Sequence, residues 1–207
     1  MDKLVAVLVV CALVSLGLKE LPRPSAEAAV PARAQGLAFA PEVAPSDRAW
    51  VLAAVAKARP EAARLIDEVD GLVTVRTYGA PGAGELGWAQ QLAPGRYELR
   101  LNVALLNGRR KIDRDMVVLH ELGHVVDFAL VAGGLRDRLA AALPRTGVCL
   151  GRRADCATAQ ERFADTFAKW ALRGAVSVTG AGYGVPAPAS LEDWGAPLAA
   201  LAARLDT

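Results

Sequence analysis

The chain has little of several features that would assign it to a functional class by composition. Only 5% of its 207 residues are aromatic, and 24 basic against 22 acidic side chains leave a formal net charge of +2. This balance gives no electrostatic basis for a nucleic-acid partner. Few aromatics beside abundant Ala, Val and Leu favour packed helices over an aromatic-rich β-sandwich. With 53% hydrophobic residues, the chain can bury one ordinary core, which excludes wholesale disorder.

One apolar run lies at the N-terminus and is short for a membrane span. It extends from Leu4 to Leu18 and is broken only by Ser15 and Gly17, which is typical of the apolar part of a secretory signal. We therefore expect residues 1–20 to be a signal peptide, so that the protein is secreted or lies at the cell surface. If this segment is not cleaved, residues 4–18 would attach the protein to a membrane.

Proline and alanine dominate the segment that follows. Residues 21–45 contain five prolines among many alanines, a composition that predicts an extended linker without a core of its own. A single folded domain is expected over residues 46–207, beginning near Ser46.

Cysteine is scarce, with three residues in the whole chain. Because Cys11 lies in the apolar run, Cys149 and Cys156 remain as an even pair in a chain expected to be exported. We predict a disulfide between them, which would contribute about 2 to 3 kcal/mol by constraining the unfolded chain. The alternative is a cysteine metal site, although neither a further Cys nor a spare His accompanies the pair.

Capping residues and apolar periodicity predict an α+β fold. A run from Tyr97 to Leu105 alternates apolar and polar residues, which indicates a strand with one buried face, and the segment before it is expected to form an antiparallel hairpin with it. Strands are expected over 72–75, 86–92 and 97–105, and helices over about 46–59, 60–70, 113–131, 135–143, 158–173 and 190–205.

The two histidines of the chain are four residues apart in the helix expected over 113–131. Residues 120–124 read His-Glu-Leu-Gly-His, the H-E-x-x-H pattern. Since a helix turns about 100° per residue, His120 and His124 lie one turn apart on nearly one face and can converge on a single zinc ion. Glu121 projects beside the pair, where it can take a proton from a metal-activated water without being a ligand.

This helix is apolar almost all the way round, which indicates that it is buried. Two buried imidazoles need polar partners, and a cation with a third ligand would supply them. The alternative is a pair of core histidines that hydrogen-bond to carbonyl groups.

A catalytic zinc needs a third protein ligand, and two carboxylates are candidates. Asp127 lies a further turn along the same helix, and no glycine turns the chain back after His124, so Asp127 is expected to support a ligand or to lie on the helix surface. Glu161 is the better candidate. It begins a Glu-x-x-x-Asp segment in which Asp165, one turn later, can orient an imidazole.

Both residues of that segment also have structural alternatives. Thr158 followed by Glu161 has the pattern of a capping box at a helix start. Asp165 followed by Lys169 has the spacing of an i,i+4 ion pair.

These motifs resemble those of the gluzincins, zinc peptidases whose ligands are the two His of H-E-x-x-H and a downstream Glu in an E-x-x-x-D setting. His-Glu-Leu-Gly-His-Val-Val-Asp at 120–127 and Glu-Arg-Phe-Ala-Asp-Thr-Phe-Ala at 161–168 resemble in particular the catalytic domains of the anthrax lethal factor-like and Pro-Pro endopeptidase group. The resemblance covers residues 97–173. It implies a zincin-like fold, with a small antiparallel sheet, an active-site helix and a following helix that carries the glutamate.

The resemblance also implies roles around the cleft. The strand expected over 97–105 would be the edge strand that pairs with an extended substrate. The group usually places a Tyr shortly before the ligand Glu to assist the oxyanion, whereas Arg, Arg, Ala, Asp and Cys occupy 152–156 here. Tyr183 is a candidate for that role.

Together these features predict an exported Zn²⁺-dependent endopeptidase that acts on proteins or peptides. Its metal ligands would be His120, His124 and Glu161, and Glu121 would be the general base. The alternative is a zincin-like domain that binds metal and peptides at the cell surface without turnover.

Overall fold

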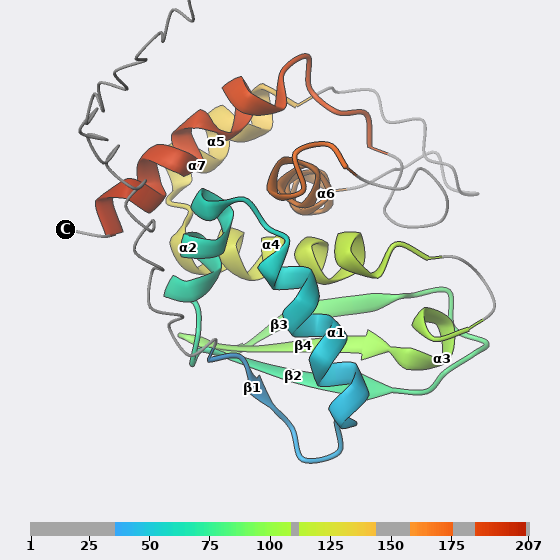
Figure 1. Ribbon diagram of the computed structural model, residues 1–207. Helices are drawn as coiled ribbons and strands as arrows, with labels where there is room; N and C mark the ends of the chain where they lie inside the picture. Colours follow the sequence, from blue (N-terminus) through green and yellow to red (C-terminus); the bar gives the residue numbers. More distant parts are fainter. Residues whose placement is uncertain (1–35, 109–111, 144–157, 176–184, 206–207) are drawn as a thin grey trace, which may run out of the picture. The chain divides into compact units, whose positions relative to one another are not determined.

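The computed structural model describes residues 36–108, 112–143, 158–175 and 185–205 (Figure 1). The predictions made for the signal segment, for the disulfide between Cys149 and Cys156, and for Tyr183 lie outside these residues. The fold is α+β, with a four-stranded sheet and helices packed on one of its faces. Among the described helices, none combines the length and the apolar character that crossing a bilayer requires.

The sheet is mixed. It contains β1 (Ala38–Phe39), β2 (Val73–Tyr78), β3 (Gly87–Ala93) and β4 (Arg96–Asn102) in the order β1-β2-β4-β3. The predicted hairpin is confirmed, because β3 and β4 are antiparallel. The prediction of an antiparallel sheet is wrong, since β1 with β2 and β2 with β4 pair in parallel. The connection after β2 passes the position of β4, so β4 inserts between two strands that precede it in sequence.

The strand predicted over 97–105 ends earlier and is not an edge strand. β4 lies between β2 and β3, and its buried side chains Tyr97, Leu99 and Leu101 face the core. After Asn102 the chain turns into the short helix α3 (Val103–Leu106), although the apolar alternation continues to Leu105. The fully buried Asn102 uses its amide to hold the β2–β3 connection, by bonds to Ala80 and to the carbonyl of Glu85.

The folded region begins before Ser46. β1 extends the sheet beside β2, and Leu37, Ala40 and Val43 are buried in the core. Residues 36–45 therefore belong to the folded region and not to the linker predicted over 21–45, because the apolar side chains of this segment are buried in the core. A proline then occupies the first turn of the first helix, where its missing N–H costs nothing.

All of the predicted helices are present. They are α1 (Pro45–Ala56), α2 (Pro60–Glu68), α4 (Arg114–Leu130), α5 (Gly133–Ala141), α6 (Ala159–Ala171) and α7 (Leu191–Leu205). Two starts follow from side-chain caps. Asp113 accepts a hydrogen bond from the amide of Met116 at 3.0 Å, and Thr158 accepts one from the amide of Glu161 at 3.3 Å.

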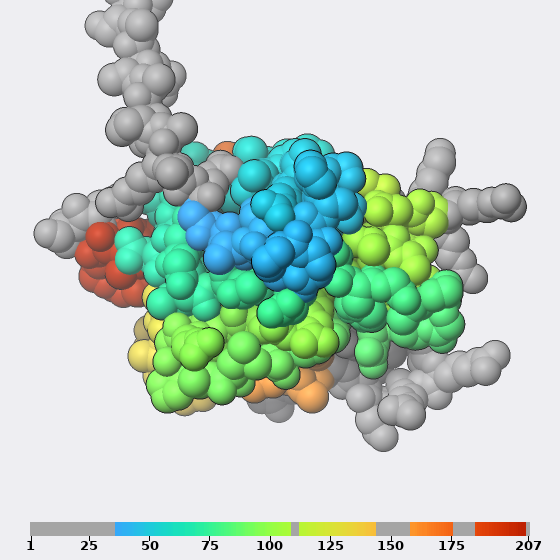
Figure 2. Space-filling model, turned by 90° about the horizontal axis from the view of Figure 1, so that it is seen from below, coloured from blue at the N-terminus to red at the C-terminus, as the bar shows by residue number. Residues whose placement is uncertain are grey.

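The long helix α4 is the centre of the fold. It crosses the sheet on the side of the helices, and α6 packs on the other side of α4 (Figure 1). In the view from below, residues of the N-terminal elements and of the strands, coloured blue to green, take up most of the visible face, with C-terminal residues in red at one edge (Figure 2). This layering places residues 116–127 of α4 in the core.

Trp170 of α6 joins the N-terminal and C-terminal helices. The guanidinium carbon of Arg59 lies 4.9 Å from the centre of its ring, and Arg59 also pairs with Glu192 of α7 at 2.7 Å. The backbone amide of Arg59 donates to the carbonyl of Ala171 at 2.9 Å. On α7, Gly195 lies directly against the indole, so that this position has no room for a side chain.

We expect Gly195→Ala to destabilise the fold. A Cβ at this position would lie 1.9 Å from Nε1 of the buried Trp170. Overpacking of this kind costs about 1–3 kcal/mol, more than the roughly 0.5–1 kcal/mol gained by replacing a helical Gly with Ala. Gly133→Ala in α5, where a Cβ meets no described atom within 4 Å, is the matched control. Urea unfolding should show a lower midpoint for Gly195→Ala alone, and equal midpoints would contradict this packing.

Candidate metal centre

Two imidazoles come from one face of α4. His120 and His124 are both buried, and their ring centres are 4.9 Å apart at an interplanar angle of 84°. The second ring also stacks on Phe128, with ring centres 5.9 Å apart. The one-turn spacing expected from the motif therefore holds in the structure, and both rings are fixed by their surroundings.

The third group comes from the neighbouring helix α6. Oε2 of Glu161 lies 3.1 Å from Nε2 of His120 and 3.3 Å from Nε2 of His124. One ligand atom from each of the three residues lies within 4.8 Å of the others. The structure thus brings together the three residues that the sequence singled out, and this group could hold a metal ion.

The donor chemistry of the group fits a divalent cation. Two imidazole nitrogens and one carboxylate oxygen point at a common centre that is largely buried. The described residues include no hydrogen-bond partner for the buried Nδ1 of His124. Two imidazole nitrogens and one carboxylate oxygen are donors that zinc takes in proteins, so the side chains that meet here fit such an ion.

A glycine sets the distance between the two helices. Gly123 lies between the histidine positions, and a Cβ there would be 3.1 Å from Cα of Ala164 and 3.0 Å from Cδ1 of Phe167. Backbone therefore meets backbone at the point where α4 and α6 cross. Sequence reasoning did not identify this role, although a small residue inside the motif was the available signal.

The structure shows one part of the capping box that is the alternative role for Glu161. Its backbone amide bonds to the side chain of Thr158, as a capping box requires. Its carboxylate instead lies against the two imidazoles. Cap and ligand are compatible, because they use different atoms of the same residue.

Glu121 is buried beside this group and is not one of its three members. Burial raises the pKa of its carboxyl to about 8, and the charge of Glu161 adds to the rise. The pKa of Glu161 is shifted in the opposite direction. Burial alone would raise its pKa, but hydrogen bonds and charge from His120 and His124 outweigh this and bring the pKa to about 2.

A cleft of about 190 Å³ opens next to Glu121. Its walls come from the start of β3 with the preceding connection, and from one face of α4. It is lined by Gly84, Glu85, Leu86, Gly87, Val117, His120 and Glu121. No local pattern in the chain indicates the lining residues from the connection, because only the mixed sheet order brings them to α4.

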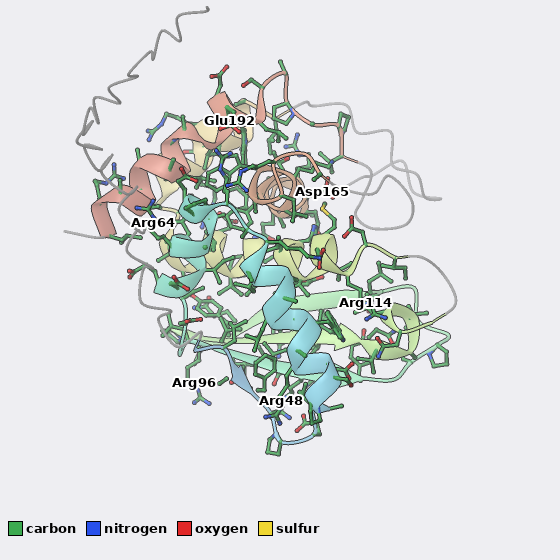
Figure 3. The ribbon with its side chains drawn as sticks, in the orientation of Figure 1. Arg48, Arg64, Arg96, Arg114, Asp165 and Glu192 are labelled. Atoms are coloured by element: carbon green, nitrogen blue, oxygen red, sulfur yellow. The ribbon has the colours of Figure 1, made fainter. Side chains whose placement is uncertain are left out.

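Asp165 is buried on α6 (Figure 3). Its Oδ2 accepts from Nζ of Lys169 at 2.6 Å, so the i,i+4 pair is present, with the carboxylate buried and the ammonium partly exposed. The same ammonium also bonds to the carbonyl of Val185. Within the described ranges the other oxygen, Oδ1, has no hydrogen-bond partner. The predicted role of Asp165 in orienting an imidazole stays a prediction.

Asp127 has a partner other than the imidazoles. Its Oδ1 accepts from Nε of Arg136 at 2.8 Å, and the same guanidinium bonds to its backbone carbonyl at 2.6 Å. Asp127 is 1% exposed, so the expectation of a surface carboxylate is wrong. Asp127 therefore joins α4 to α5. The sequence pattern of α4 alone cannot predict this contact, because Arg136 lies beyond the turn at Val131.

Comparisons with known proteins give no relative. No family model matches the chain, and neither a curated protein nor a solved structure matches it.

We expect Gly123→Ala to weaken metal binding. The added Cβ would press on the backbone of Ala164 and on Phe167, moving α6 and the Glu161 carboxylate away from the imidazoles. Displaced supporting groups typically cost about 10- to 100-fold in metal affinity. Competition with a zinc-sensitive dye measures the affinity, with Gly133→Ala as the control. Unchanged affinity in Gly123→Ala would show that the helix spacing does not control the site.

Glu161→Gln tests the third ligand without disturbing the helix start. The cap uses the backbone amide of residue 161, so the fold should keep its stability. Loss of the carboxylate charge should weaken metal binding by at least about tenfold. Circular dichroism checks the fold and isothermal titration with zinc checks the affinity. Full affinity in this variant would remove Glu161 from the ligand set.

Proposed function

We propose that the protein is a zinc-dependent endopeptidase of the gluzincin type, which its motifs resemble. The observation that carries the proposal is the arrangement around the cleft. His120, His124 and Glu161 converge on one centre, and a fourth titratable group, Glu121, lines the cleft beside them without belonging to the cluster. A purely structural metal site has no need of such a carboxylate.

Zinc is the metal we assign to the three ligands. Two imidazole nitrogens and one carboxylate oxygen are a ligand set of catalytic zinc sites, which keep a further position open. When bound, zinc supplies Lewis acidity toward a water molecule and toward a substrate carbonyl oxygen.

Glu121 would accept a proton and then donate it during peptide hydrolysis. Burial raises the pKa of Glu121, whereas the positive charge of a bound zinc ion would lower it and favour the ionised carboxylate. That carboxylate would take a proton from the attacking water as the new carbon–oxygen bond forms at the peptide carbonyl. The carbon–nitrogen bond then breaks, and Glu121 returns the proton to the amine nitrogen that leaves. A buried carboxylate at the cleft wall is suited to this, because bulk water does not compete for the proton.

An extended peptide is the substrate class that the sheet favours. β3 is the last strand in the sheet order, and its first residue, Gly87, lines the cleft. A peptide that pairs with the outer side of β3 would run past Glu121 and the metal ligands. We therefore propose that β3, and not the segment 97–105 that the resemblance suggested, is the edge strand that pairs with substrate. Export by residues 1–20 stays part of the proposal.

Replacing Glu121 by Gln tests the function. The amide cannot accept the proton, so turnover should fall by about 10²–10⁴-fold, while zinc binding through the other three residues is retained. Digestion of a peptide library with mass readout, with and without a chelator, measures both effects. Cleavage by Glu121→Gln at the wild-type rate would remove Glu121 as the base.

The same experiment decides the rival function. A metal-binding domain that captures peptides without turnover would bind zinc and leave the library intact in the wild-type protein as well. Chelator-sensitive cleavage that is lost in Glu121→Gln excludes that alternative.

A further inference from the structure

We infer that Gly87 is the positioning residue for Glu121, because its missing side chain leaves the space that the carboxylate occupies. This inference rests on the proposed function for its effect on catalysis, and on the structure alone for the contact itself.

The contact is close. A Cβ at position 87 would lie 3.0 Å from Oε1 of Glu121 and 3.2 Å from its Cγ. It would also lie 3.0 Å from the carbonyl oxygen of Arg100 on the neighbouring strand. The carboxylate that we propose as the base therefore lies against the space that a side chain at 87 would occupy.

The register of the sheet explains why position 87 faces α4. Gly87 is opposite Leu101 in the antiparallel pair of β3 and β4. The side chain of Leu101 is fully buried in the core, and residues opposite each other point to the same face of a sheet. A side chain at 87 would therefore point toward the helix layer, where Glu121 lies.

Backbone conformation does not account for glycine at this position. Gly71 and Gly95 have φ values of 74° and 68°, which only glycine adopts readily. Gly87 is not among the glycines with positive φ, and it is the first residue of β3, where it pairs with Leu101. A glycine in a strand often marks a close approach by another group. Here that group is the carboxylate of Glu121.

The two walls of the cleft fix the carboxylate between them. Glu121 sits in the buried middle of α4, and Gly87 lines the same cleft from the opposite element. α4 is held on its other side by α6 through Gly123, so it has little freedom to retreat. Adding a methyl group at 87 would displace the carboxylate toward the open cleft and away from the position set by the present packing.

The catalytic test is Gly87→Ala. A misplacement of about 1 Å can cost roughly 10²-fold in rate, so we expect kcat to fall by that order while KM changes little. Zinc stoichiometry and affinity should match wild type, because the atoms nearest to a Cβ at 87 belong to Arg100 and Glu121 and not to the three proposed ligands. Gly82→Ala is the matched control, since it lies in the connection before β3, outside the cleft lining, and a Cβ there meets no described atom within 4 Å.

A second test needs no activity. Gly87→Ala is made in the wild-type chain and in a Glu121→Ala chain, and thermal unfolding is measured for all four proteins. The clash with the Arg100 carbonyl is common to both backgrounds and cancels in the cycle. The clash with Glu121 exists only in the wild-type background, so Gly87→Ala should lower Tm by about 2–4 °C more there. If Gly87→Ala folds only when Glu121 is absent, that also supports the inference.

The outcomes separate the two proposals. Equal Tm losses in both backgrounds, or a kcat for Gly87→Ala equal to that of Gly82→Ala, would overturn the inference. If the wild-type protein cleaves no peptide, the proposed function fails. The unfolding cycle would still decide whether Gly87 makes room for Glu121.

Discussion

The close contact between α4 and α6 at Gly123 is the constraint on which the site depends. α4 supplies two imidazoles and α6 supplies one carboxylate, and neither helix can form the cluster alone. The distance at which the helices cross is set by backbone atoms, with Cα of Ala164 within 3.1 Å of where a Cβ would be. Because packed interiors transmit small displacements, one methyl group at this crossing acts on a carboxylate at the start of α6.

Burial gives the cluster its chemical character. His120, Glu121 and His124 lie in the most buried part of α4, where isolated charges are costly. The convergence of the imidazoles on Glu161 offsets part of that cost, and it explains why the two glutamates have opposite pKa directions. The glutamate against the imidazoles is held as an anion, whereas the glutamate at the cleft wall is held by burial toward its neutral form.

Local signals in the sequence were sufficient for the helices and for the cluster. The caps at Asp113 and Thr158 fixed two helix starts, and the spacing of two histidines fixed their common face. Glu161 could be singled out because an E-x-x-x-D segment gave a second carboxylate one turn later. Each of these features depends on residues within a few turns of one another, whereas Glu161 is 41 residues from His120 and meets it only because α4 and α6 cross.

Such local signals do not predict which strands pair when they are far apart in the sequence. The parallel pairing of β2 with β4 joins segments more than twenty residues apart, and no local pattern distinguishes it from a simple hairpin series. The two-residue strand β1 is too short to have a period. The partner of Asp127 is on another helix, and the buried amide of Asn102 ends β4 through contacts with a distant connection. The cleft wall at Gly87 follows from that same strand order.

The packing of Trp170 under Gly195 has a consequence for the order of assembly during synthesis. A ribosome releases the chain from its N-terminus, so all three ligand residues emerge before α7, which covers the indole on the helix that carries Glu161. Until that cover arrives, the indole of Trp170 lacks the part of its packing that Gly195 supplies. The candidate metal site is therefore linked, through Trp170, to a helix that contributes none of its three residues.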